Sequence, residues 1–357
     1  MKVAILGSGN GAHAVAFDFS RAGNDVYMCD FVQFPTNISA ISAQGGIYAE
    51  GEMEGFQKVI YAGHDFETAV KDADIVLAVA TANAAVPLAE VCKPFVKPGQ
   101  IFVVCPGSCF GVIEFKRALG YELNDPTVVV AETSTLPYAA RIVKPGTVTI
   151  PNRLKGGLWV AALPKSATER VFEIMNTVYE AIRPASSILQ TSLQNGNPAI
   201  HPAIMLSNLA RVENKLSWQF YHDGVTLGVG RIIEAVDKER IAIGAACGVK
   251  IMDDPTLGLQ QGYMYDATYD VGYIKSPGFA GIMAPTTADH RYFDEDANGL
   301  CLWEDMGKAL GVDTTAITSV INMCCIVRAK DYRAIMTKSM KSLGLDEYEP
   351  ARLGELL

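Results

Sequence analysis

The sequence lacks the features that mark several large classes of protein. It has no run of five or more lysines or arginines, and its net charge is −9 with a pI near 5.1. A protein that binds nucleic acid or an anionic membrane surface usually presents a strongly basic patch, so we expect neither as a partner. No apolar stretch reaches the roughly 18 residues that a membrane-spanning helix needs. The expected partners are therefore small molecules.

Patterns of metal binding and secretion are also missing. None of the eight cysteines forms a C-x-x-C pair or stands near a histidine at the spacing of metal ligands. The amino terminus, MKVAILGSGN, has neither the charged start nor the long apolar stretch of a signal peptide. We therefore expect no metal site, reduced thiols in the core and a cytoplasmic location.

The order of apolar runs predicts the fold of the first half. Short β-rich runs alternate with helical stretches, which is typical of a parallel sheet with helices on both faces. KVAILG and DVYMCD are the expected first two strands, and ADIVLAVA and QIFVVCPG read as central strands buried on both sides. TVVVAET, GTVTI and GGLWVAALP suggest extra strands at the far edge, and the sheet is expected to end near residue 164.

The second half has the periodicity of helices. A length of 357 residues allows two domains, because single hydrophobic cores rarely grow past roughly 250 residues. We predict a doubly wound, dinucleotide-binding Rossmann domain over residues 1–185 and a mainly α-helical substrate domain over residues 186–357, with a cleft between them. Amphipathic or buried helices are expected at residues 203–214, 236–247, 300–311 and 314–325.

A glycine-rich turn follows the first expected strand. In VAILGSGNGAHAVAFDFSRAG the spacing is G-x-G-x-x-A, the form in which a turn and a helix start receive the diphosphate of a dinucleotide. The candidate contacts in this turn are Gly7, Gly9, Asn10, Gly11 and Ala12. The alternative is a tight strand-to-helix turn without a ligand.

The second strand ends in an acidic residue that bears on the choice of nucleotide. Asp30 can accept both hydroxyls of a ribose but would repel a 2′-phosphate, and CDFVQFPTN offers no arginine or lysine to bind that phosphate. NAD is therefore favoured over NADP. Asn83, Pro106 and Gly107 follow later strands, where sheets of this type place the nicotinamide side of the ligand crevice.

One histidine stands out in the second half. His201 precedes Pro202 in QNGNPAIHPAI, and because proline favours the first turn of a helix, we expect His201 to cap a helix with its ring turned into the cleft. A catalytic histidine would need a carboxylate partner. Arg291 and Asp296 are candidates, five positions apart in an expected loop before a helix that starts near Leu300.

Several stretches together resemble the octopine and nopaline dehydrogenases, the opine dehydrogenase family. They are GSGNGAHA near the amino terminus, ETSTLPYAAR at 132–141, NPAIHP at 197–202, FYHDGVT at 220–226 and HRYFDED at 290–296. The resemblance implies an NAD-dependent oxidoreductase acting on CH–NH groups, which condenses an α-keto acid with an amino acid and reduces the product with NADH. It also implies that His201 and Asp296 form a catalytic pair and that Arg291 holds a substrate carboxylate.

Other interpretations stay open at this point. His201 could be structural, Asp296 could cap a helix, and Arg291 could belong to a surface ion pair. The chain could instead be a keto acid reductase like the ketopantoate reductases, which needs no amine, or a nucleotide-binding protein without catalysis. A cationic amino acid substrate would need a carboxylate facing the pocket, and Asp266 and Asp270 are the candidates for it. The sequence leaves the oligomeric state open, with a homodimer as one option.

Overall fold

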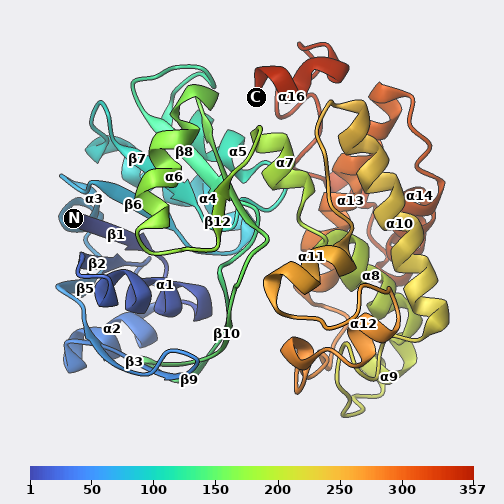
Figure 1. Cartoon of the computed structure of the whole chain (residues 1–357), viewed down its shortest axis with the longest axis horizontal. Helices are drawn as coiled ribbons and strands as arrows, with labels where there is room; N and C mark the ends of the chain where they lie inside the picture. Colours follow the sequence, from blue (N-terminus) through green and yellow to red (C-terminus); the bar gives the residue numbers. More distant parts are fainter. The chain divides into compact units, whose positions relative to one another are not determined.

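Two compact units make up the chain. The computed structural model describes residues 1–357, apart from the side chain of Glu295. Unit 1 comprises Met1–Thr191 with Leu357, and unit 2 comprises Ser192–Leu356 (Figure 1). Unit 1 contains the strands and unit 2 is helical.

An eight-stranded sheet forms the centre of unit 1. Its order is β12-β11-β8-β7-β6-β1-β2-β5, and all neighbouring strands are parallel except the antiparallel pair β8 and β11. The strands are β1 (Lys2–Leu6), β2 (Asp25–Cys29), β5 (Tyr61–Gly63), β6 (Ile75–Ala78), β7 (Ile101–Val104), β8 (Val129–Thr133), β11 (Leu158–Leu163) and β12 (Ile182–Pro184). The side chains of β6 and β7 are buried throughout, because helices cover both faces of a parallel sheet. The expected fold class is confirmed.

The helices of unit 1 connect these strands. They are α1 (Asn10–Arg21), α2 (Pro35–Gln44), α3 (Phe66–Val70), α4 (Ala85–Cys92), α5 (Gly111–Leu119) and α6 (Thr168–Asn176). The helix α7 (Ile188–Leu193) follows and contains the boundary between the two units. Short 3₁₀ turns lie at η1 (Ala82–Ala84), η2 (Lys93–Phe95) and η3 (Lys165–Ala167).

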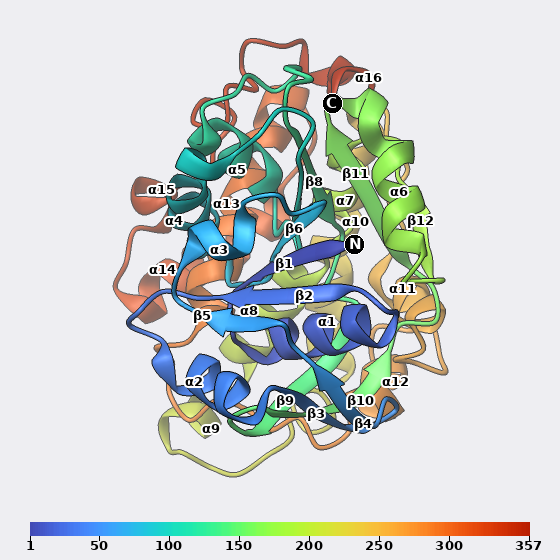
Figure 2. The ribbon, with the colours of Figure 1, turned by 90° about the vertical axis from the view of Figure 1, so that its left-hand side faces the viewer.

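A second sheet corrects one of the strand expectations. It has the order β4-β3-β10-β9 and contains β3 (Gly46–Gly51), β4 (Gly55–Lys58), β9 (Tyr138–Lys144) and β10 (Thr147–Arg153). GTVTI therefore belongs to this sheet and not to the far edge of the first one. The helix α1 packs against strands of both sheets, which explains why nearly all of its middle is buried (Figure 2).

The main sheet also continues past residue 164. After α6, the strand β12 adds a parallel edge next to β11. This strand has only three residues and ends in Pro184, a residue confined to sheet edges, so no apolar run announced it.

Unit 2 is built on four helices that pack on one another: α8 (Asn197–Ser207), α10 (Leu227–Ala246), α13 (Arg291–Leu310) and α14 (Thr315–Arg328). Trp303 of α13 is fully buried in their core. The shorter elements are α9 (Leu209–Glu213), α11 (Asp254–Gln261), α12 (Val271–Ile274), η4 (Pro277–Phe279), α15 (Tyr332–Ile335), η5 (Pro350–Arg352) and α16 (Leu353–Leu356).

Two of the helices that carry candidate site residues begin earlier than the sequence suggested. The helix α8 begins at Asn197, with Pro198 in its first turn, so Pro202 lies inside the helix. The helix α13 begins at Arg291, about nine residues before the expected start, and is capped by His290. Both changes move candidate site residues from loops into helices.

All eight cysteines are free thiols, and among the described residues only Cys325 is partly exposed. Burial raises the pKa of the Cys105 thiol to about 12, so it stays protonated. The described helices include none that is both long and apolar enough to cross a membrane.

Candidate active site

The turn after β1 has the geometry that a diphosphate requires. Gly7 has a φ of +114°, and a Cβ on it would lie 2.4 Å from the carbonyl oxygen of Val79, so only glycine fits. Gly9 is the N-cap of α1, and a Cβ there would meet nothing within 4 Å. The backbone N–H groups at the start of this 12-residue helix can therefore receive an anionic group.

The rest of the turn is tightly packed. A Cβ on Gly11 would lie 2.9 Å from the side chain of Leu136, and Ala12 is fully buried. The side-chain oxygen of Asn10 accepts a hydrogen bond of 2.8 Å from the backbone nitrogen of Ile142, which ties the start of α1 to β9. This bond uses only the side-chain oxygen, so the backbone N–H and the side-chain NH2 group of Asn10 can both donate to an anion.

Asp30 connects the end of β2 to the same turn. One of its carboxylate oxygens accepts from the Ser8 hydroxyl at 2.6 Å, and the other accepts from the backbone nitrogen of Phe31 at 2.8 Å. Each carboxylate oxygen can accept a further hydrogen bond, so a ligand hydroxyl can still bind. The side chain is buried but lies directly after the strand, where the sequence placed it.

A small hollow lies at the carboxyl ends of β6 and β7. Pro106 and Gly107 are among its lining residues, whereas Asn83 stands beside it in η1 and accepts a hydrogen bond from Thr81 at 2.6 Å. A Cβ on Gly107 would lie 2.0 Å from a carboxylate oxygen of Glu132, so a side chain at this position is excluded.

His201 is the centre of a buried polar chain in unit 2. It lies in α8, its side chain is 3% exposed, and its Nδ1 is 2.8 Å from a carboxylate oxygen of Asp296 in α13. Its Nε2 is 3.0 Å from the hydroxyl of Tyr221. The packing of α8 on α13 therefore brings together residues that are 95 positions apart.

Aromatic rings enclose the imidazole. The ring centroid of Tyr292 is 4.0 Å from that of His201, and Phe220 meets it edge-on at 5.7 Å. Burial lowers the pKa of His201 below its usual value, although the Asp296 carboxylate works in the opposite direction and Arg291 adds to the lowering. Desolvation is therefore the stronger of the two opposing effects on the pKa of His201.

Tyr221 is itself held between flat rings. The ring of Phe279 stacks on it at 4.1 Å and that of Tyr273 lies nearly parallel at 6.2 Å. Burial raises the pKa of Tyr221 well above its usual value, so the phenol remains neutral. A neutral hydroxyl in contact with His201 can pass a proton in either direction.

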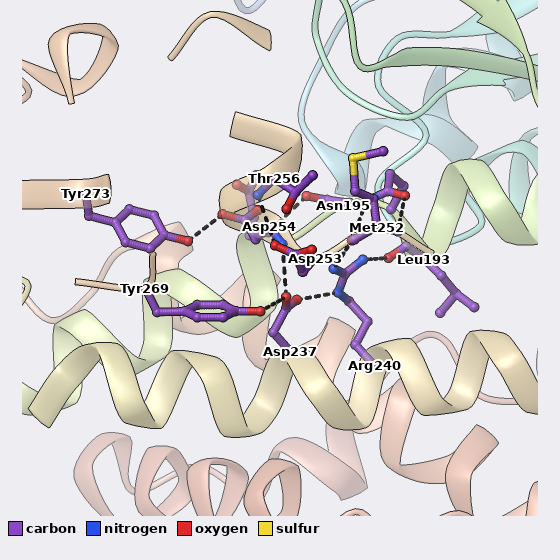
Figure 3. A network of polar contacts seen from close by, with 12 residues as sticks. Leu193, Asn195, Asp237, Arg240, Met252, Asp253, Asp254, Thr256, Tyr269 and Tyr273 are labelled. Carbon is purple, nitrogen blue, oxygen red and sulfur yellow. Dashed lines mark hydrogen bonds and ion pairs between the residues drawn. The ribbon is translucent and has the colours of Figure 1, made fainter. Parts of the chain in front are cut away.

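A network of buried charges supports the start of α8 (Figure 3). Asp237 of α10 accepts from Arg240 at 2.7 Å, from the Tyr269 hydroxyl at 2.7 Å and from the backbone nitrogen of Asp254 at 3.0 Å. Arg240 also donates to the carbonyl oxygens of Leu193 and, at 2.8 Å, of Met252. Both members of the Asp237–Arg240 ion pair are fully buried.

Asp254 links this network to the rings around Tyr221. Its carboxylate accepts a hydrogen bond from the hydroxyl of Tyr273 and lies so close to Gly196 that a Cβ there would be 2.1 Å from its oxygen. Burial, with the nearby charge of Asp237, raises the pKa of Asp254 to about 6. Because Asp254 lies so close to Gly196, the residue before α8 must be glycine.

Comparison with known proteins identifies the family. The model of the NAD/NADP octopine/nopaline dehydrogenase α-helical domain matches residues 184–328. An opine dehydrogenase of Arthrobacter sp. (strain 1C) is 32% identical over 349 residues, which cover 96% of this chain and 94% of the relative. The chain belongs to the opine dehydrogenase family. It is therefore an NAD-dependent oxidoreductase acting on CH–NH groups, as the motifs implied.

Other relatives agree with this assignment. The vitopine synthase of Allorhizobium ampelinum is 29% identical and is covered over 99% of its length by the whole of this chain. Among solved structures, an octopine dehydrogenase in complex with NADH and agmatine shares the fold with a TM-score of 0.78 at 18% identity, covering 100% of this chain and 96% of its own. A ketopantoate reductase from Ralstonia eutropha JMP134 has a TM-score of 0.61 at 20% identity, covering 93% of this chain and 99% of its own.

The structure changes the local setting of each catalytic candidate in this opine dehydrogenase. His201 is not a helix cap, because α8 begins four residues earlier and encloses it. Asp296 lies in the second turn of α13 and caps nothing. Arg291 is the first residue of that helix, is exposed, and places its guanidinium 4.8 Å from the centroid of the Tyr292 ring.

Tyr221 is the residue that the sequence did not reveal. The stretch FYHDGVT was part of the family resemblance, but no function was assigned to it. Its histidine, His222, makes a hydrogen bond of 2.7 Å to the carbonyl oxygen of Ser276. Tyrosine next to a phenylalanine in an irregular stretch is an ordinary packing pattern, so only the folded structure shows the contact with His201.

Proposed function

We propose that this enzyme condenses an α-keto acid with the amino group of an amino acid, through an imine that is reduced to a secondary amine. The observation that carries the proposal is the buried His201–Asp296 hydrogen bond of 2.8 Å, in a chain that belongs to the opine dehydrogenases. Solved octopine dehydrogenases hold NADH together with agmatine, L-arginine or pyruvate, which supports these substrate classes.

The turn after β1 fits a dinucleotide. We assign its binding to residues 1–185, through Gly7, Gly9, Asn10, Gly11, Ala12, Asp30, Asn83, Pro106 and Gly107. Asp30 would accept the ribose hydroxyls, and the residues after it carry no positive charge for a 2′-phosphate, so NADH is the proposed form and NADPH the weaker ligand. When bound, the reduced nicotinamide supplies a hydride to the substrate carbon.

Residues 186–357 would bind the substrates and move the proton. Amine attack on the keto acid gives a carbinolamine, and its hydroxyl leaves as water only when it receives a proton. Protonated His201 is the source of that proton, and Asp296 orients the ring by accepting from Nδ1. Arg291 has the planar, doubly donating group that suits a substrate carboxylate, and its exposure leaves it accessible.

The first experiment follows NADH oxidation with pyruvate and a panel of amino acids, and with pyruvate alone. We expect turnover only when a suitable amino acid is present. Turnover at the same rate without any amine would contradict the proposal and indicate a simple keto acid reductase. The panel includes cationic amino acids, because Asp266 and Asp270 are the carboxylates that the sequence offers for them.

The cellular setting completes the proposal. Eight free thiols favour a reducing compartment, and we propose the cytoplasm. Analytical ultracentrifugation distinguishes a monomer from the homodimer that the sequence left open.

A further inference from the structure

Both ring nitrogens of His201 already have partners, and this raises the question of which atom meets the substrate. Nδ1 is 2.8 Å from Asp296, Nε2 is 3.0 Å from Tyr221, and Tyr292 covers one face of the ring. We propose that Tyr221 is a further catalytic residue, whose hydroxyl delivers the proton to the substrate and takes a replacement from His201. The inference rests on the proposed function, since it concerns the same proton.

The directions of the hydrogen bonds depend on the charge of the imidazole. An ionised carboxylate only accepts, so Nδ1 carries a proton that it donates to Asp296. In the neutral ring Nε2 has no proton and accepts from the Tyr221 hydroxyl. In the imidazolium Nε2 donates to the phenol oxygen, and the phenol proton then turns away from the ring. Charging His201 therefore makes the proton of Tyr221 available.

The position of Tyr221 suits the end of such a chain. Its hydroxyl bonds to Nε2, whereas Asp296 bonds to Nδ1, so Tyr221 and Asp296 are the two ends of the polar chain. Both Tyr221 and His201 are buried, with residue exposures of 7% and 2%. Stacking on Phe279 at 4.1 Å, with interplanar angles of 18° to that ring and 9° to Tyr273, fixes the plane of the phenol. Tyr273 is held in turn by its hydrogen bond to Asp254 (Figure 3). This packing therefore fixes the orientation of the Tyr221 hydroxyl.

In the reductive direction, two proton transfers accompany the loss of water from the carbinolamine. The Tyr221 proton moves to the hydroxyl oxygen of the carbinolamine, whose C–O bond breaks to release water as the nitrogen lone pair forms the C=N bond. The Nε2 proton moves to the phenol oxygen at the same time, so Tyr221 is neutral before and after the step and His201 changes from imidazolium to imidazole. The iminium carbon is then reduced by the hydride that NADH supplies. In the oxidative direction each transfer is reversed.

Replacing Tyr221→Phe tests the relay, because phenylalanine keeps the stacked ring and removes only the hydroxyl. We expect kcat to fall about 100-fold or more, the magnitude of a lost general acid, with little change in KM and with unchanged NADH binding in a fluorescence titration. The matched control is Tyr332→Phe in α15, which loses a buried tyrosine hydroxyl bonded to Asp294 but leaves His201 and Tyr221 paired. Its kcat should stay within about three-fold of the wild type, since no proton passes through it.

A proton inventory gives a second readout. Two protons move together in the relay. A plot of the rate against the D₂O fraction should therefore be curved for the wild-type enzyme and straight for Tyr221→Phe. Wild-type kcat in Tyr221→Phe would overturn the relay and show that His201 acts directly. An equal loss in both tyrosine variants would overturn it as well, because it would indicate a purely structural effect.

An alternative variant covers the case in which Tyr221→Phe does not fold. Incorporation of 3-fluorotyrosine at position 221 keeps the hydrogen bonds but makes the phenol a stronger acid. The relay predicts a changed kcat and solvent isotope effect for this substitution and no change for 3-fluorotyrosine at position 332. Unchanged values at 221 would reject the relay. Amine-independent turnover of the wild type would instead reject the proposed function, so the two failures are distinguishable.

Discussion

His201 shows how burial competes with a charged partner. The imidazole is enclosed by aromatic rings and its side chain is 3% exposed, which disfavours the imidazolium. Asp296 partly offsets this effect, and the net result is a pKa below the usual value. The resting enzyme therefore holds a neutral histidine at neutral pH, which is ready to accept a proton in the oxidative direction.

Replacing Asp296→Asn should shift this balance further. The carboxylate raises the pKa of His201, so its removal lowers that pKa again. Opine oxidation requires neutral His201 and loses activity as the pH falls through its pKa. We therefore expect the acidic limb of log kcat/KM to move to lower pH in the variant, together with a fall in kcat of about 100-fold from the lost orientation.

The matched control for this variant lies on the same helix. Asp294 binds Lys330 and Tyr332 and does not contact His201, so Asp294→Asn should leave the acidic limb in place. An unchanged limb in Asp296→Asn, measured from pH profiles of opine oxidation, would contradict the assignment of Asp296 as the partner.

Helix α8 depends on a network that belongs to other elements. Arg240 of α10 binds the carbonyl oxygens of Leu193 and Met252, and Asp254 at the start of α11 lies against Gly196. These contacts fix the chain just before α8 and hence the helix that carries His201. The ion pair Asp237–Arg240 is fully buried, so each charge depends on the other.

Replacing Arg240→Met should therefore be strongly destabilising. The change leaves Asp237 buried without its counter-ion, and breaking a buried pair in this way costs about 3–5 kcal/mol. Arg231→Met is the control, because Arg231 is exposed on the same helix and should change stability by less than about 0.5 kcal/mol. Urea unfolding measures both values. A loss of less than about 1 kcal/mol in Arg240→Met would contradict the role of the network.

The sequence was sufficient to predict secondary-structure elements that have a strong local pattern. The runs that became β1, β6, β7 and β8 each contain at least four consecutive apolar residues, and the glycine turn before α1 has a fixed spacing. These strands and this turn could therefore be identified. The strand β12 has three residues, and β3 and β4 are short strands of a second sheet, so their pairing depends on distant partners. No local pattern could predict that pairing.

The start of α8 was ambiguous for a specific reason. Pro198 and Pro202 both fit the first turn of a helix, and only the structure shows that Pro198 occupies it. The pairing of His201 with Asp296 came from family resemblance and not from spacing, because the two residues are 95 positions apart. The contact of Tyr221 with His201 depends on the folded path of an irregular segment, which carries no periodicity.

At the scale of the whole molecule, the two units have separate cores and separate tasks. The candidate cofactor residues all lie within Met1–Thr191, whereas His201, Tyr221 and Asp296 lie within Ser192–Leu356. Unit 1 has a core of strands and helices and unit 2 a core of helices, so we expect them to unfold as distinct cooperative units. A ligand that binds one unit should then stabilise that unit more than the other.

Calorimetry with NADH tests this division. At 100 times its dissociation constant NADH should stabilise unit 1 by about 2.7 kcal/mol and raise its unfolding midpoint, equally in the wild type and in His201→Ala. Turnover should be abolished in that variant. Trp159 lies in unit 1 and Trp218 and Trp303 lie in unit 2, so fluorescence of a Trp159→Phe variant identifies the transition of unit 2. A single transition that moves as a whole with NADH would contradict independent unfolding.

The distribution of the cysteines has a practical consequence for studying this enzyme in solution. Seven of the eight thiols are buried, and Cys325 in α14 is the one that a water-borne reagent can approach among the described residues. A maleimide dye should therefore attach at one place without any engineered mutation. The natural protein thus carries a specific labelling position on unit 2, from which changes during a catalytic cycle can be observed one molecule at a time.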